Sequence, residues 1–254
     1  MATGNAPAAG HALAILTLLA RHATPVAAAT VARELGLPRS STYHLLAVLV
    51  EQGFAVHLPE EQRYGLGVAA FELGSAYTRQ APLQRLARPR LTRLADAAGH
   101  NAHLAVLHGA DVLYVVEERV AGRPSLVTEV GVRLPATLTA SGLAILAALP
   151  PAQVRALYPS RGSFVQRHGT GPRALPELRR ELAATRARGY AVEDGLVTPG
   201  LASVASAVLD HSGHPVAGVA VTYPAQDDVD VPGLVRQVCA CTRELSDRLG
   251  HRGP

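Results

Sequence analysis

The sequence contains no lysine and no tryptophan, and it has only three phenylalanines among its 254 residues. Because lysine is absent, all 24 basic side chains are arginines, whose guanidinium groups suit phosphate and carboxylate recognition. With so few large aromatic side chains, the core has to consist mainly of alanine, leucine and valine. No apolar run is long enough for a membrane-spanning helix, and the N-terminus does not have the pattern of a signal peptide. We therefore expect a cytoplasmic protein that does not bind a membrane.

Cysteine is also scarce, and the two cysteines, Cys239 and Cys241, are separated by a single residue. This spacing does not suit a zinc site, and a disulfide between them would be strained. His100 and His103 have no third metal ligand near them in the sequence. There is no Cys-x-x-Cys pair, no G-x-S-x-G motif and no glycine-rich phosphate loop. We therefore expect no metal, no cofactor and no catalytic residue.

The net charge of +4 is unevenly distributed. Residues 1–80 contain five arginines and five glutamates, so this part of the chain is formally neutral. The next stretch has four arginines between residues 85 and 93, which are either a basic stripe or a solvated helix face. Because bulk charge gives no support for nucleic-acid binding by the N-terminal part, such binding has to rest on the geometry of a motif.

The first 66 residues have the pattern of three helices followed by a hairpin. Apolar spacing predicts helices over residues 10–22, 27–35 and 38–52, with Gly36 ending the second. Two extended segments, 53–58 and 63–67, flank the polar sequence "PEEQ", as strands flank a turn. This order is typical of a winged helix-turn-helix domain, whose third helix enters the major groove of DNA.

The third helix has two different faces. Thr42, Leu45, Leu46 and Leu49 follow the spacing of a core-facing stripe. The polar residues gather at the N-terminal end, where a recognition helix meets bases and phosphates, although serines also simply favour helix starts. Together with one arginine of the hairpin, this end gives the predicted DNA contacts: Arg39, Ser40, Ser41, Thr42, Tyr43, His44 and Arg63.

Beyond the hairpin, residues 68–80 are predicted to form a linker helix within a linker segment 67–82. Residues 83–254 then alternate between helices and strands. We expect strands over 102–120, 126–135, 190–196 and 201–224, and helices over 83–99, 139–150, 151–159, 174–189 and 231–250. The predicted fold is therefore α/β with an antiparallel sheet.

Two groups of residues carry a resemblance to the IclR family of bacterial transcription regulators. The first contains the turn "GLP" at residues 36–38, the pairs "SS" and "LL" in the third helix, and the wing sequence "RYGLG". The second is the stretch "RGYAVEDGLVTPGLASVASAVLDHSGHPVAGVAVTYP", residues 188–224. The resemblance covers nearly the whole chain and implies a GAF-like effector domain after the winged helix.

The resemblance also implies what the protein does. Family members are generally dimers or tetramers that bind double-stranded operator DNA and repress or activate a metabolic operon in response to a small organic effector. The effector is expected to be a carboxylic acid or an aromatic metabolite. Residues at the matching positions are the candidate effector contacts: Ala140, Ser141, Glu193, Leu201, Ser203, Ala220 and Thr222.

These candidates suggest complementary roles. Ala140 and Ser141 could offer backbone N–H groups to a carboxylate, and Ser203 and Thr222 could donate hydroxyl hydrogen bonds. Glu193 could accept a hydrogen bond from a ligand hydroxyl or amine. Each of these residues could instead serve packing alone.

The chain departs from the family pattern at several positions. Thr137 and Leu143 replace a usual histidine and lysine, Gly195 and Leu196 replace an acidic pair, and Ser203 replaces a cysteine. These departures predict that a structural ion pair of the family is absent here.

Two questions stay open at this point. The protein could be a sensor that acts through a protein partner rather than through DNA, or, less consistently with its motifs, a hydrolase. The surface that joins two protomers is not evident either. We hypothesise that the linker helix around Phe71 and Tyr77 provides it.

Overall fold

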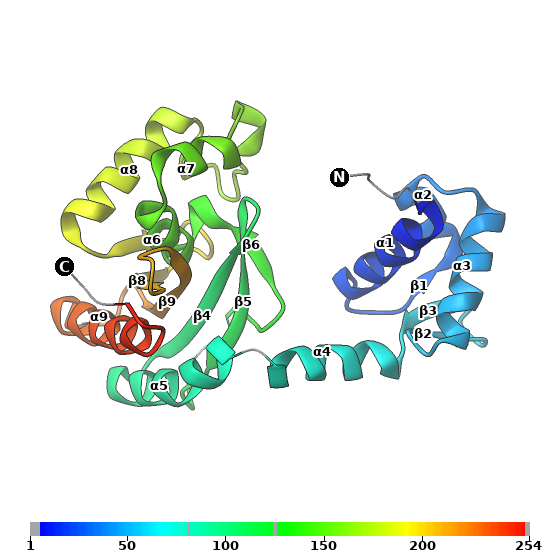
Figure 1. The fold of residues 1–254 in the computed structure, drawn as a ribbon, viewed down its shortest axis with the longest axis horizontal. Coiled ribbons are helices and arrows are strands. Elements are labelled where there is room, and N and C mark those ends of the chain that lie inside the picture. Colours follow the sequence, from blue (N-terminus) through cyan, green and yellow to red (C-terminus); the bar gives the residue numbers. More distant parts are fainter. Residues whose placement is uncertain (1–5, 81, 124–125, 252–254) are drawn as a thin grey trace. The chain divides into compact units, whose positions relative to one another are not determined.

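The computed structural model describes residues 6–80, 82–123 and 126–251, and leaves out the side chains of residues 75, 77–80 and 82. The chain divides into two compact units, and the boundary along the chain lies between residues 81 and 82 (Figure 1). No helix in the described part of the chain is long and apolar enough to cross a membrane.

The N-terminal unit is a winged helix-turn-helix domain, as predicted. Its strands form a small antiparallel sheet in the order β1-β3-β2. The two-residue strand β1 was not predicted, because two residues carry no readable alternation. The elements are α1 (Pro7–Arg21), β1 (Val26–Ala27), α2 (Ala28–Leu35), α3 (Arg39–Glu51), β2 (Ala55–Leu58) and β3 (Arg63–Leu66).

Packing inside this unit fixes the position of α3. Ile15, Val31 and Leu46 come from three different helices and are fully buried in one core. Gly36 ends α2 with a φ of +64°, a left-handed conformation that glycine adopts without strain. Gly67 follows the wing where a Cβ atom would collide with the carbonyl oxygen of Gly53. These two glycines of the family-like motifs therefore serve the turn and the wing.

The linker helix α4 (Val68–Gln80) begins directly after the wing. Its first turn is tied to the N-terminal unit because the Ala69 N–H donates to the Gly53 carbonyl at 3.0 Å. The helix groups with the N-terminal unit, and the second unit begins at Pro82. The division into residues 1–66, 67–82 and 83–254 stays a prediction.

The second unit is an antiparallel sheet covered by helices on both faces. The strand order is β6-β5-β4-β9-β8-β7, and every neighbouring pair is antiparallel. The strands are β4 (Asn101–His108), β5 (Asp111–Glu118), β6 (Arg133–Pro135), β7 (Ala191–Asp194), β8 (Leu201–Leu209) and β9 (Pro215–Pro224).

Two apolar clusters hold the helices to the sheet. One cluster joins the sheet to α6, α7 and α8, and the other joins it to α5 and α9 (Figure 1). Almost every α6 side chain is buried, so this helix lies in the centre of the first cluster. The helices are α5 (Pro82–Ala98), α6 (Ala140–Ala148), α7 (Pro151–Leu157), α8 (Leu175–Arg188) and α9 (Val231–Arg248), with short 3₁₀ turns at Ala136–Leu138 and Arg161–Ser163.

The strand predicted over residues 126–135 is wrong for most of its length. Only Arg133–Pro135 pairs with β5, and the preceding residues form a loop. The chain turns at Gly131, where φ is +92°, and the Gly131 N–H donates to the Tyr114 carbonyl at 2.9 Å. Two residues of this loop, Leu126 and Thr128, are buried.

Candidate functional sites

The N-terminal end of α3 presents the predicted DNA-contacting residues to solvent. Arg39, Ser40, Ser41, Tyr43 and His44 are all exposed, with 54% of Tyr43 accessible. Pro38 occupies the N-cap, and no side chain in the described structure caps this end of the helix. The first backbone N–H groups therefore stay free for an anionic partner such as a phosphate.

Thr42 does not belong to this exposed group, and its prediction as a DNA contact is wrong. Its side chain is fully buried, and its hydroxyl donates to the Pro38 carbonyl at 3.0 Å. Leu46 and Leu49 are buried on the same face, whereas Leu45 is half-buried. Thr42 therefore holds the start of α3 against the core, in agreement with its position in the core-facing spacing.

Arg63 lies in β3 of the wing and is exposed. One of its guanidinium nitrogens donates to the Pro25 carbonyl at 2.9 Å, which ties the wing to the segment before α2. Its contact with DNA stays a prediction.

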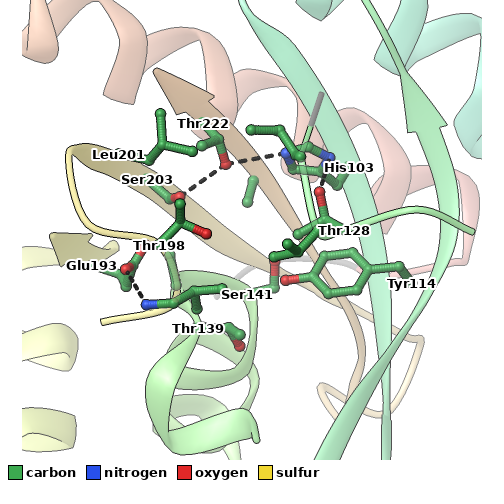
Figure 2. A pocket seen from close by; sticks show the side chains of 15 residues that line it. His103, Tyr114, Thr128, Thr139, Ser141, Glu193, Thr198, Leu201, Ser203 and Thr222 are labelled. Carbon is green, nitrogen blue, oxygen red and sulfur yellow. Dashed lines mark hydrogen bonds between the residues drawn. The ribbon is translucent and has the colours of Figure 1, made fainter. Parts of the chain in front are cut away.

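In the second unit, one cavity brings together all seven predicted effector contacts. They come from the start of α6, from β7 and from the paired strands β8 and β9 (Figure 2). Eight further residues line the cavity and were not predicted as contacts: His103, Tyr114, Leu126, Val127, Thr128, Thr139, Val197 and Thr198.

The start of α6 forms one end of this cavity. The Thr139 hydroxyl caps the helix by accepting from the Gly142 N–H at 3.0 Å. In the described part of the chain, the N–H groups of Ala140 and Ser141 have no acceptor. A Cβ atom on Gly218 would come within 2.6 Å of the Ser141 carbonyl oxygen, so this glycine lets β9 lie against the start of the helix. Two N–H donors are thus presented to the cavity.

The Ser141 hydroxyl adds a third donor. It is buried and has no hydrogen-bond partner of good geometry among the described residues. Figure 2 shows it beside the Tyr114 hydroxyl. Burial, and then the nearby Glu193 carboxylate, raise the pKa of Tyr114 more than the neighbouring Thr139 and Ser141 hydroxyls lower it, so the Tyr114 hydroxyl keeps its proton.

A chain of hydrogen bonds crosses the opposite wall of the cavity. Thr128 Oγ1 lies 3.4 Å from His103 Nδ1, His103 Nε2 lies 3.1 Å from Thr222 Oγ1, and that oxygen lies 2.8 Å from Ser203 Oγ. Burial, and then the charge of Arg119, lower the pKa of His103 to about 3. The imidazole is therefore neutral at physiological pH, and this wall offers polar groups without charge.

Glu193 is buried at the edge of the cavity and is already engaged. Its Oε1 accepts from the N–H groups of Leu196 and Val197, at 2.7 and 3.1 Å. Burial raises the pKa of its carboxyl group. This carboxylate therefore holds the loop of residues 195–200, a role that the sequence did not predict.

The departures from the family pattern also have defined positions. Leu143 is buried in the core cluster between α6 and the sheet, and Thr137 is buried in the turn before α6. Leu196 stands where the family has an acidic residue, and its backbone N–H donates to Glu193. These positions are filled by apolar or neutral groups.

His103 shows which signal could have extended the predicted site. It is a histidine within β4, and its neighbours Ala102, Leu104 and Ala105 in the strand are apolar. No group of three histidine, cysteine or acidic side chains in the described structure could hold a metal ion. A polar side chain in an otherwise apolar buried strand has to find a hydrogen-bond partner, and that requirement points to the polar wall.

Comparison with known proteins agrees with this architecture. Residues 8–59 match the model of the IclR helix-turn-helix domain, and residues 75–247 match that of the bacterial transcriptional regulator IclR C-terminal domain. The chain belongs to the IclR family. It is therefore a DNA-binding transcriptional regulator, as the resemblance implied.

Individual IclR-family relatives match along almost their whole length. The acetate operon repressor of Salmonella typhimurium is 30% identical over 96% of this chain and 90% of its own. The glycerol operon regulatory protein of Streptomyces griseus is 32% identical over 94% of each chain. A solved IclR homolog from Microbacterium hydrocarbonoxydans, complexed with 4-hydroxybenzoate, has the same fold, with a TM-score of 0.75 and 24% identity over 94% of this chain and 98% of its own.

Proposed function

We propose that the N-terminal end of α3 reads the operator of a metabolic operon. The observation that carries this assignment is the joint exposure of Arg39, Ser40, Ser41, Tyr43 and His44 beside uncapped backbone N–H groups. Arginine can bind guanine through two hydrogen bonds, and hydroxyl groups suit bases and phosphates. Because its partner is operator DNA, we propose a cytoplasmic location.

We propose that the cavity of the second unit binds a small organic carboxylate as effector. The free N–H groups of Ala140 and Ser141, with the buried Ser141 hydroxyl beside them, form a site for a carboxylate group. The neutral His103 and the hydroxyls of Ser203 and Thr222 can hydrogen-bond an oxygen at the other end of the ligand.

We further propose that two or more chains act together, with α4 as a contact between protomers. Val68, Phe71 and Leu73 of this helix are 69%, 74% and 64% exposed, which is unusual for large apolar side chains so close together. The side chain of Tyr77, the second residue of the hypothesis, lies outside the described residues. A formally neutral reading domain gains affinity when two copies are linked, because the second binding event becomes intramolecular.

Operator binding measured by fluorescence anisotropy tests this function. The probe is the promoter fragment upstream of the protein's own gene, and the trial effectors are benzoates, hydroxybenzoates and short 2-oxo and 2-hydroxy acids. We expect tight binding to this fragment relative to random DNA, and a change in affinity with one of these acids. Equal affinity for both DNAs would contradict the operator assignment, and indifference to every acid would contradict the effector class.

A further inference from the structure

The positive charge of the chain is concentrated in the segment that contains α7 and α8. Residues 151–190 include eight arginines and two glutamates, a net charge of +6, although the whole chain carries only +4. All eight arginines are exposed. Exposed like charges at this density repel one another, so their concentration is unfavourable unless an anionic partner neutralises them.

Three arginines of α5, on the other face of the sheet, form ion pairs within the fold. In α5, Arg88 pairs with Glu118 at 2.9 Å, and Arg90 and Arg93 pair with Glu244 of α9 at 2.9 and 3.4 Å. These residues belong to the possible basic stripe of the sequence analysis. These three arginines of α5 are neutralised within the fold.

Five arginines of the α7–α8 segment have no such partner. Within the described residues, their guanidinium groups form no ion pair and no hydrogen bond with the protein. Arg173, Arg186 and Arg188 do contact the protein, through Gly169, Ala147 and Glu181. We call the five free residues the α7–α8 arginine surface: Arg155, Arg161, Arg167, Arg179 and Arg180.

The fold directs this surface outward. Val154 of α7 and Leu178 and Leu182 of α8 are buried in one cluster against the sheet. Arg155 and Arg179 directly follow buried residues of these helices and are exposed. The two helices lie on the side of the sheet opposite α5 and α9 (Figure 1). The apolar residues of α7 and α8 therefore fix the helices, and the arginines are left to solvent.

We propose that the α7–α8 arginine surface binds the phosphate backbone of DNA, as a second DNA contact separate from the reading helix α3. Two observations favour DNA over other anionic partners. The chain is a DNA-binding regulator, and its N-terminal unit is formally neutral over residues 1–80. Phosphate contacts by arginine and lysine supply most non-specific affinity for DNA, and a neutral reading unit cannot supply it through net charge. The free guanidinium groups concentrated in the second unit can supply this non-specific affinity.

The test is the salt dependence of binding to a long random-sequence duplex by the full chain. The variant Arg155→Gln/Arg179→Gln/Arg180→Gln removes three charges from the surface. Each lost phosphate contact lowers the steepness of log K against log salt by about 0.9, so we expect a slope shallower by roughly 2 to 3. At low salt the affinity should fall by about tenfold or more.

A matched variant separates local contact from net charge. Arg85→Gln/Arg243→Gln/Arg248→Gln removes the same charge from exposed positions on α5 and α9, and we expect a nearly unchanged slope.

Equal slopes for the two variants would mean that only the overall field matters, and would overturn the proposal. A wild-type slope for the α7–α8 variant would overturn it as well. If that variant bound DNA normally but failed to regulate transcription, the partner would be an acidic protein instead of DNA. An unchanged melting temperature checks that both variants are folded.

Discussion

Ser203 and Thr222 face each other across β8 and β9, and their hydroxyl oxygens lie 2.8 Å apart. Thr222 continues this contact to the buried His103. The serine that replaces the usual cysteine of the family thus joins a hydrogen-bonded wall, because its hydroxyl is a stronger donor and acceptor than a thiol.

Ser203→Leu is therefore expected to abolish the effector response. The larger side chain would occupy the cavity and break the contact with Thr222, weakening effector binding by about tenfold or more, or roughly 1.4 kcal/mol. Isothermal titration calorimetry with the responsive acid measures this, and binding to operator DNA should stay unchanged. Ser203→Cys keeps the volume and serves as control. If Ser203→Leu responded like wild type, the effector would have to bind elsewhere.

Arg39→Ala should weaken binding to the operator much more than binding to random DNA. A bidentate contact between arginine and guanine contributes about 1–3 kcal/mol of discrimination. Competition gel shifts with both DNAs measure the ratio. Arg21→Ala, at the exposed end of α1, removes the same charge and should leave the ratio unchanged. An equal loss on both DNAs would reduce Arg39 to a phosphate contact.

Thr42→Val should lower the stability of the N-terminal unit without changing its DNA preference. The substitution removes one buried hydrogen bond, which contributes about 1 kcal/mol. The Pro38 carbonyl still accepts from the Thr42 N–H, so it does not become unpaired. Denaturant unfolding and operator discrimination are measured on the same variant. A selective loss of operator affinity in a stable protein would restore Thr42 as a DNA contact.

Acidification should destabilise the second unit through His103. Its folded pKa of about 3 lies below the ordinary value of about 6.5, so the unfolded chain binds a proton more readily. The contribution of His103 to the free energy of unfolding is fully present above pH 6.5. It is lost as the pH falls from 6.5 towards 3. At pH 5 the loss amounts to about 2 kcal/mol as an upper value.

The variant His103→Gln isolates this effect, because glutamine does not titrate. Between pH 7 and pH 5, its unfolding free energy should fall by less than that of the wild type. Glu193 acts in the opposite direction above its ordinary pKa, since burial raises its pKa, but it is present in both proteins and cancels in the comparison. Identical pH profiles would show that His103 is protonated in the folded state.

Phe71→Glu should separate protomers if α4 joins them. We expect wild type to be a dimer or larger in light scattering at low concentration, and the variant to be smaller and to bind the operator more weakly. The neighbouring Glu72→Gln changes an exposed side chain of the same helix and should keep the wild-type mass. A wild-type monomer would remove the basis for linked binding, and an unchanged mass of Phe71→Glu would move the interface elsewhere.

Much of the fold was readable because local patterns suffice for its long elements. The spacing of Leu46 and Leu49 defined the inner face of α3, and Gly36 marked the end of α2. Contacts between distant segments were less readable. Leu126 and Thr128 lie in a segment predicted as a strand, but they form a loop that lines the cavity, and the Gly131 N–H of this loop bonds to the distant Tyr114 carbonyl.

In the candidate effector site, too, local motifs predicted some residues and long-range packing brought in others. The family-like motifs located the start of α6 and the strand positions Ser203 and Thr222 on the cavity. Only the tertiary structure brought His103 to Thr222, separated by 119 residues. The sequence determined which residues are exposed on a helix or paired on a hairpin, because those relations depend on local periodicity. Strand order and packing decided which side chains share a cavity and which arginines stay unpaired, because those relations join residues that no local pattern connects.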